Sequence, residues 1–154
     1  MKILIIEDDA EFSRQIRTYL EGEEYRCEQA DTYESALDKL SFYQYDCILL
    51  NPMLPGGDGI RLLTYLRERQ LSAGLIVIST EDLLDDKILW LRIGADDYMA
   101  RPFHLSELSA RIYSIIRRRQ FQNNNMIAFK EMKMDLLAKS LYVRDKPVTL
   151  TKKE

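Results

Sequence analysis

The sequence predicts an α/β fold in which a five-stranded, parallel, doubly wound sheet carries helices on both faces. Two observations predict it. Five short apolar runs alternate with segments of helical periodicity over residues 2–119. The apolar runs are almost uninterrupted, which is typical of strands buried on both faces, and such strands belong to parallel sheets.

The first part of this region contains two strand–helix pairs. Residues 2–6 (KILII) form a buried strand that ends at three acids, and residues 10–22 place apolar side chains at helical spacing up to Gly22. A second strand is predicted over residues 25–30. The helix that follows, over residues 32–43, begins with a threonine that can cap its N-terminus.

The middle of the chain repeats this alternation. Residues 46–50 form the third predicted strand, and the Pro- and Gly-rich residues 52–59 form a loop. A helix is predicted over residues 60–69, a strand over residues 75–78 and a helix over residues 81–93.

The last pair is a short strand at residues 98–100 and a helix at residues 104–119. In such sheets the functional crevice lies beyond the carboxyl ends of the strands, so polar residues that follow the strands should converge on one site. These residues are Glu7, Asp8, Asn51, Ser79 and Arg101.

The composition excludes several classes of protein. Of 154 residues, 46% are hydrophobic and 31% are charged, which excludes a disordered chain. No apolar run could cross a bilayer, and the N-terminus is too short and acidic for a signal peptide. Cys27 and Cys47 lie in apolar segments and indicate packing thiols in a reducing, cytoplasmic protein without a membrane partner. The lone histidine, His104, excludes His-based zinc sites, and no nucleophile–base pair is visible, so an enzyme is not expected.

The charge is unevenly distributed. Residues 1–116 hold 12 Lys and Arg against 21 Asp and Glu, whereas residues 117–154 hold 10 against 4. An acidic body with a basic tail fits a regulatory domain joined to a nucleic-acid-binding domain. Alternatively, the arginines at 117–119 only complement the dipole at a helix C-terminus.

After Arg119 the sequence pattern changes. Residues 120–125 (QFQNNN) are interpreted as a polar linker. Short strands of an antiparallel meander are predicted at residues 126–129, 132–137, 141–143 and 148–150. Residues 151–154 (TKKE) have a capping-box pattern, and a helix that begins there without a body suggests truncation.

These motifs together resemble a known family. IIEDD after the first strand, PMLPGGDG after the third and GADDYMARPF around the fifth are similar to response-regulator receiver domains, which implies a flavodoxin-like fold for residues 1–121. Residues 122–154, a linker followed by MIAFKEMKMDLLAKSLYVRDKPVTLTKKE, resemble the opening β-sheet of the winged-helix DNA-binding domain in OmpR/PhoB-type regulators.

The resemblance implies a phosphoryl-transfer site. Glu7 and Asp8 match the family's acids that hold Mg²⁺, and Met53 matches its carbonyl ligand. Ser79 matches the hydroxyl that binds the phosphoryl group, and Tyr98 matches the aromatic switch residue. Plain core packing is the alternative interpretation of Tyr98.

Two positions depart from the family pattern. Asn51 stands at the phosphoacceptor position, and a neutral carboxamide forms no acyl phosphate and weakens Mg²⁺ binding, so no resident cofactor is expected. The usual deamidation of Asn51 to Asp needs the backbone N–H of the next residue. That residue is Pro52, which has no N–H, so this route is not available. Arg101 stands at the lysine position and is expected to pair with Glu7 or Asp8.

The resemblance also implies a homodimer through the fourth helix, fifth strand and fifth helix. The predicted cross-subunit ion pairs are Lys87 with Glu107, Asp96 with Arg111, and Asp97 with Arg118, around an apolar centre of Ile88 and Leu91. Trp90 on the fourth helix is expected to pack in the core or to add apolar area near this face.

These features predict an atypical transcriptional regulator that dimerises without phosphorylation. DNA binding is expected from the winged-helix domain of the complete protein and not from these residues alone. The sequence identifies no partner kinase. Two alternatives remain: an ordinary phosphorylated regulator with an Asp-to-Asn change at the acceptor, and a protein-interaction module with a vestigial pocket.

Overall fold

The computed structural model describes residues 1–56, 59–69, 71–81 and 83–138. It divides into two compact units, Met1–Arg119 and Gln120–Glu154. The first unit contains the whole sheet. None of the helices in the described part of the chain combines the length and the apolar character that a membrane crossing requires.

The sheet has five strands in the order β2-β1-β3-β4-β5, and all neighbouring pairs are parallel. The strands are β1 (Lys2–Ile6), β2 (Arg26–Ala30), β3 (Cys47–Leu50), β4 (Gly74–Ser79) and β5 (Asp97–Ala100). This order confirms the predicted doubly wound sheet, because the connections cross from β1 to β2 in one direction and from β3 onward in the other.

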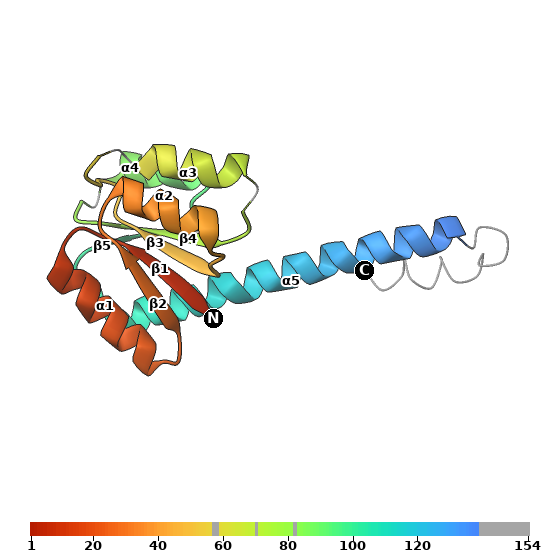
Figure 1. Cartoon of the computed structure of the whole chain (residues 1–154), viewed down its shortest axis with the longest axis horizontal. Helices are drawn as coiled ribbons and strands as arrows, with labels where there is room; N and C mark the ends of the chain where they lie inside the picture. Colours follow the sequence, from red (N-terminus) through yellow and green to blue (C-terminus); the bar gives the residue numbers. More distant parts are fainter. Residues whose placement is uncertain (57–58, 70, 82, 139–154) are drawn as a thin grey trace. The chain divides into compact units, whose positions relative to one another are not determined.

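Helices cover both faces of the sheet (Figure 1). Those that follow the strands are α1 (Ala10–Gly22), α2 (Tyr33–Phe42), α3 (Gly59–Glu68), α4 (Leu84–Ile93) and α5 (Leu105–Ala138). Helices α2, α3 and α4 pack on one face with one apolar core, and α1 and the start of α5 pack on the other face with a second core.

The two cores explain why the strands are apolar without alternation. In β1, Leu4 and Ile6 enter the core beneath α2, α3 and α4, whereas Ile3 and Ile5 enter the core beneath α1 and α5. All four side chains are buried, with exposed fractions of 1% or less. A strand that faces two cores has no polar face.

Local sequence signals fix several helix ends. The Thr32 hydroxyl accepts the Ser35 N–H at 3.0 Å and caps α2, as predicted. The Asp9 carboxylate accepts the Phe12 N–H at 3.1 Å and caps α1. Helix α4 begins at Leu84, three residues later than predicted.

The prediction for residues 120–137 is wrong. In place of a linker at residues 120–125 and strands at 126–129 and 132–137, helix α5 continues from Leu105 to Ala138. The segment contains no Gly and no Pro, so no residue in it interrupts the helix, and an Asn costs a helix only a few tenths of a kcal/mol, roughly.

The remaining tail predictions lie outside the described residues. These are the strands at residues 141–143 and 148–150 and the helix start at 151–154. The assignment of residues 122–154 to a second domain therefore stays a prediction.

Candidate functional site

The pairing of β1 with β3 places two predicted site residues next to each other. Ile6 pairs with Leu50 at the ends of these strands, and the Asn51 N–H donates to the Ile6 carbonyl at 2.9 Å. Glu7 and Asn51 therefore leave the sheet side by side at its carboxyl edge.

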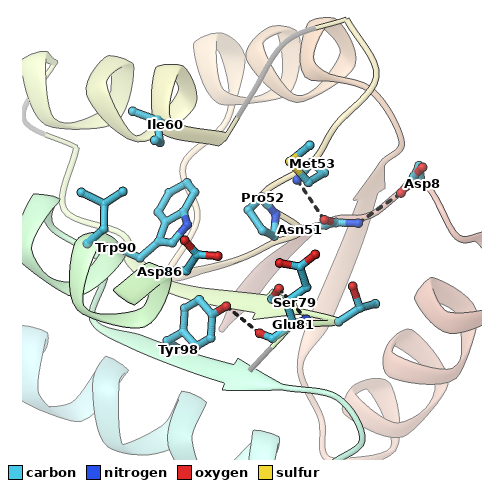
Figure 2. Close-up of a pocket in the computed structure, with 12 residues that line it drawn as sticks. Asp8, Asn51, Pro52, Met53, Ile60, Ser79, Glu81, Asp86, Trp90 and Tyr98 are labelled. Carbon is cyan, nitrogen blue, oxygen red and sulfur yellow. Dashed lines mark hydrogen bonds between the residues drawn. The ribbon is translucent and has the colours of Figure 1, made fainter. Parts of the chain in front are cut away.

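The Asn51 side chain is held by three hydrogen bonds, and Figure 2 draws the two that it makes with Asp8 and Met53. Its Nδ2 donates to Glu7 Oε2 at 3.0 Å and to Asp8 Oδ1 at 3.2 Å. Its Oδ1 accepts the Met53 N–H at 3.0 Å. The carboxamide thus bridges the two acids after β1 to the loop after β3.

Arg101 approaches Glu7 from the other side. Its Nη2 donates to Glu7 Oε1 at 3.0 Å, and its Nη1 lies 3.9 Å from Asp9 Oδ2. The guanidinium carbon lies 3.8 Å from the centre of the Phe12 ring, a cation–π distance. The sequence predicted the pairing of Arg101 with an acid, and the structure selects Glu7.

Glu7 is the most constrained carboxylate of the site. Its side chain is only 4% exposed, and both of its oxygens are used: Oε1 by Arg101, and Oε2 by Asn51 and by the Asp9 N–H at 3.0 Å. Burial raises the pKa of Glu7 above its ordinary value of 4.5, and the hydrogen bonds from Asp9 and Asn51 and the charge of Arg101 limit that rise. We call Glu7, Asp8, Asn51 and Arg101 the Glu7 cluster.

The Glu7 cluster does not fit a magnesium ion. A hard cation needs several oxygen ligands with free lone pairs, whereas here the Asn51 Nδ2 points at both carboxylates and Arg101 binds Glu7. Among the described residues, no group of three Asp, Glu, His or Cys side chains is placed to hold a metal. The positive charge beside Glu7 is supplied by the chain itself.

Ser79 and Tyr98 meet at one residue of the loop after β4. The Ser79 hydroxyl accepts the Glu81 N–H at 3.0 Å, and the Tyr98 hydroxyl donates to the Glu81 carbonyl at 2.8 Å (Figure 2). Tyr98 is 5% exposed, so its ring is packed inward. Both predicted residues therefore lie at the same edge of the sheet as Asn51.

A cavity of about 580 Å³ opens between these loops and helix α4. Its wall combines residues of the site with apolar and acidic side chains that were not predicted to belong to it. The lining residues are Asp8, Asn51, Pro52, Met53, Ile60, Ser79, Thr80, Glu81, Asp86, Leu89, Trp90 and Tyr98.

Trp90 is a cavity residue and not a residue of the predicted dimer face. It is 6% exposed and packs so closely on Gly59 that a Cβ there would lie 2.9 Å from the indole Cη2. The expectation that Trp90 adds apolar area near that face is wrong, because the indole turns toward α3. The other expectation, core packing, is confirmed.

Four of the six charged residues of the predicted dimer face, Asp96, Asp97, Glu107 and Arg111, are paired within the chain. Arg111 binds Asp97 at 2.6 Å and Glu107 at 3.0 Å. Asp96 binds Arg119 at 2.9 Å. The predicted cross-subunit pairs of Asp96 with Arg111 and of Asp97 with Arg118 would have to compete with these intrachain contacts. The cross-subunit pairs therefore stay predictions.

The apolar centre of the predicted face is exposed in this chain. Ile88 is 40% exposed and Leu91 is 39% exposed, while Lys87 is half-buried and Arg118 is exposed. Nothing in the described part of the molecule covers these two apolar side chains fully, which is what an interface centre requires.

A parallel sheet in this strand order, with two acids after β1, a polar residue after β3 and a hydroxyl after β4, defines the class of receiver domains. The chain matches the family "Response regulator receiver domain" over residues 3–113 and belongs to it.

Known relatives and structures agree with this assignment. The chain is 36% identical over 154 residues to the transcriptional regulatory protein PmrA of Pectobacterium parmentieri, covering all of this chain and 69% of that protein. It is 36% identical over 154 residues to the cell cycle response regulator CtrA of Brucella abortus and covers 66% of its length. The chain thus spans about two thirds of the relatives that it matches.

Two solved receiver domains have the same fold. The receiver domain of the Francisella response regulator 1452 is 32% identical, with a TM-score of 0.72 over 76% of this chain and 97% of that one. The BeF3-activated receiver domain of Klebsiella pneumoniae RstA is 30% identical, with a TM-score of 0.72 over 76% of this chain and 99% of that one.

Proposed function

We propose that this chain is the receiver part of an OmpR/PhoB-type transcriptional regulator that dimerises without phosphorylation. The observation that carries the proposal is the Glu7 cluster. Its acceptor position holds an amide that donates to Glu7 and Asp8, and its cation is Arg101.

The chemistry of Asn51 closes the usual route of activation. A carboxylate oxygen can attack a phosphoryl donor, whereas the neutral carboxamide is a poor nucleophile and forms no acyl phosphate. Its oxygen also accepts the Met53 N–H, so one of its two lone pairs is already engaged.

Arg101 supplies a permanent positive charge beside Glu7, where a typical receiver domain would bind Mg²⁺ reversibly. A guanidinium stays protonated at any physiological pH and contacts a carboxylate at a fixed geometry. Its contacts to Glu7 and Phe12 join the loop after β5 to β1 and α1. A side chain that stabilises the dimer-competent arrangement replaces a ligand that would otherwise select it.

The surface formed by α4, β5 and α5 supports a homodimer. Leu84, Ile88 and Leu91 recur at helical spacing on α4 and are exposed by 68%, 40% and 39%. Charged side chains surround this stripe, and two of them, Lys87 and Glu107, have the complementary signs that a symmetric interface needs.

DNA binding is proposed for the complete protein. The relatives PmrA and CtrA are named as a transcriptional regulator and a response regulator, and both are longer than this chain. We assign operator binding to a winged-helix domain of the complete protein. A sensor kinase has no acceptor at Asn51, so we propose no phosphorelay through this site.

Sedimentation velocity of the full chain, with and without acetyl phosphate and Mg²⁺, tests the proposal. A dimer whose fraction is unchanged by acetyl phosphate is expected. A monomer at all concentrations, or a dimer that forms only with acetyl phosphate, would contradict it.

A further inference from the structure

The described residues that line the cavity beside Asn51 carry negative charge and no positive charge. Three carboxylates, those of Asp8, Glu81 and Asp86, belong to its wall. No Lys, Arg or His is present among the described residues that line it. Such a wall repels phosphate and attracts cations.

The cation of this edge is directed elsewhere. Arg101 follows β5 at the same edge of the sheet, but its guanidinium binds Glu7 and stacks on Phe12 on the α1 side. Its charge is therefore neutralised outside the cavity, and the three acids of the wall have no basic side chain among them.

The rest of the wall is apolar and aromatic. Met53, Ile60 and Leu89 are exposed by 77%, 41% and 45%, and Trp90 and Tyr98 bring two aromatic rings. A volume of about 580 Å³ is within the usual range for sites that bind small organic molecules. Aromatic rings bind organic ammonium groups better than they bind anions.

Trp90 adds a hydrogen-bond donor to this wall. Its side chain is 6% exposed, and no hydrogen-bond partner of its indole N–H is found among the described residues. Figure 2 shows the indole beside Asp86, with its nitrogen toward Pro52 and Asp86. The indole N–H is therefore available to donate to an acceptor on a bound ligand.

We propose that this cavity binds a small organic cation, an amine with an apolar or aromatic body and a hydroxyl or carbonyl acceptor. Asp86 and Glu81 bind the ammonium group, Trp90 donates to the acceptor, and Ile60 and Leu89 contact the body. The proposal rests on the proposed function in one respect, that no phosphoryl group occupies the cavity.

The chain has one tryptophan, so its fluorescence reports this cavity directly. Three probes share a phenylcarbinol body and differ in charge: phenylethanolamine, styrene glycol and mandelate. Titration up to about 10 mM covers the affinity expected for molecules of this size. Binding of phenylethanolamine is expected to shift the Trp90 emission and to give a heat signal in calorimetry. Its affinity is expected to be several-fold higher than that of styrene glycol. Mandelate is expected not to bind.

Two variants separate charge from shape. Asp86→Asn keeps the side-chain size and is expected to weaken phenylethanolamine about three- to fivefold while leaving styrene glycol unchanged. Asp38→Asn, an exposed acid on α2, is the matched control and is expected to leave both unchanged. Thermal unfolding of each variant verifies that the fold is intact.

Equal binding of the three probes, a preference for mandelate, or no binding of any probe would overturn the proposal. So would equal affinity of phenylethanolamine for the parent chain and the Asp86→Asn variant. Phosphoryl transfer to the chain, measured separately by mass spectrometry, would contradict the proposed function without changing the order of affinities of the three probes.

Discussion

Arg101 and Glu7 form an ion pair of 3.0 Å that joins residues 94 positions apart in the chain. Their side chains are 22% and 4% exposed, so the pair is largely removed from water. The contact connects the carboxyl end of β5, an outermost strand of the sheet, to the carboxyl end of β1, an interior strand.

Removal of Arg101 should destabilise the protein. Arg101→Ala leaves the Glu7 carboxylate buried without its charged partner, so the free energy of unfolding in urea should fall by about 1–3 kcal/mol. Arg92→Ala, an exposed arginine on α4, is the control and should change it by less than about 0.5 kcal/mol. Equal effects of the two variants would show that the ion pair contributes nothing measurable.

Glu7 should make stability fall as the pH rises. Because burial raises its pKa above 4.5, the folded state holds the Glu7 proton more tightly than the unfolded state. Its contribution is therefore fully present below pH 4.5 and is lost as the pH rises through the folded pKa. Urea unfolding measured across this window should show a smaller decline for Glu7→Gln than for the parent chain.

Glu11 provides the control of opposite sign. Its hydrogen bonds to Arg14 lower the pKa of the Glu11 carboxyl, so its contribution is present above the ordinary value and lost toward acid. Glu11→Gln should therefore not reduce the decline of the free energy of unfolding as the pH rises. A parallel pH profile for the parent chain and Glu7→Gln would be inconsistent with the buried position of Glu7.

Asn51 should prevent phosphoryl transfer. The parent chain incubated with acetyl phosphate and Mg²⁺ should gain no phosphoryl group in intact-mass spectrometry. Asn51→Asp supplies a nucleophile but keeps Arg101 on Glu7, so partial acceptance is expected. The double variant Asn51→Asp with Arg101→Lys should accept more, and an acid-labile adduct in the parent chain would refute this assignment.

Magnesium should bind the parent chain weakly. The Asn51 Nδ2 faces both carboxylates, so calorimetric titration should give no site of sub-millimolar affinity. Asn51→Asp replaces a donor by an anionic oxygen and should tighten binding at least tenfold, or about 1.4 kcal/mol. Equal affinity for both chains would place the ion elsewhere.

A charge exchange should test the proposed dimer. Lys87→Glu and Glu107→Lys should each weaken the dimer, since each brings like charges together across the interface. The double exchange should restore most of the lost association, and sedimentation velocity at micromolar concentrations measures all four chains. Independent effects of the two changes would remove Lys87 and Glu107 from the interface.

The sequence predicts the sheet well because each strand is apolar on both faces. KILII can only be an internal strand, and its two cores confirm this. The end of α5 could not be predicted in the same way. Residues 126–137 hold apolar residues at spacings that suit either a strand or a helix, and no Gly or Pro decides between them.

The sequence allowed the residues of the Glu7 cluster to be predicted, but it did not allow most of their contacts to be predicted. Asn51 and Arg101 stand out as departures from a motif, and the structure brings both to Glu7. Three-dimensional packing alone turns Trp90 toward α3, since apolar and charged residues are mixed around its helix and give no preferred direction. The Gly59–Trp90 contact joins residues distant in sequence, so the sequence alone could not indicate this direction.

The cation of the Glu7 cluster is the side chain of Arg101, which is a permanent part of the protein. An acyl phosphate appears and hydrolyses within one protein molecule, whereas Arg101 is present from synthesis to degradation. On the proposed function, no kinase or phosphatase can reset such a receiver. The fraction of dimer then follows mass action, so the cell would set the output by how much of the protein it makes and removes.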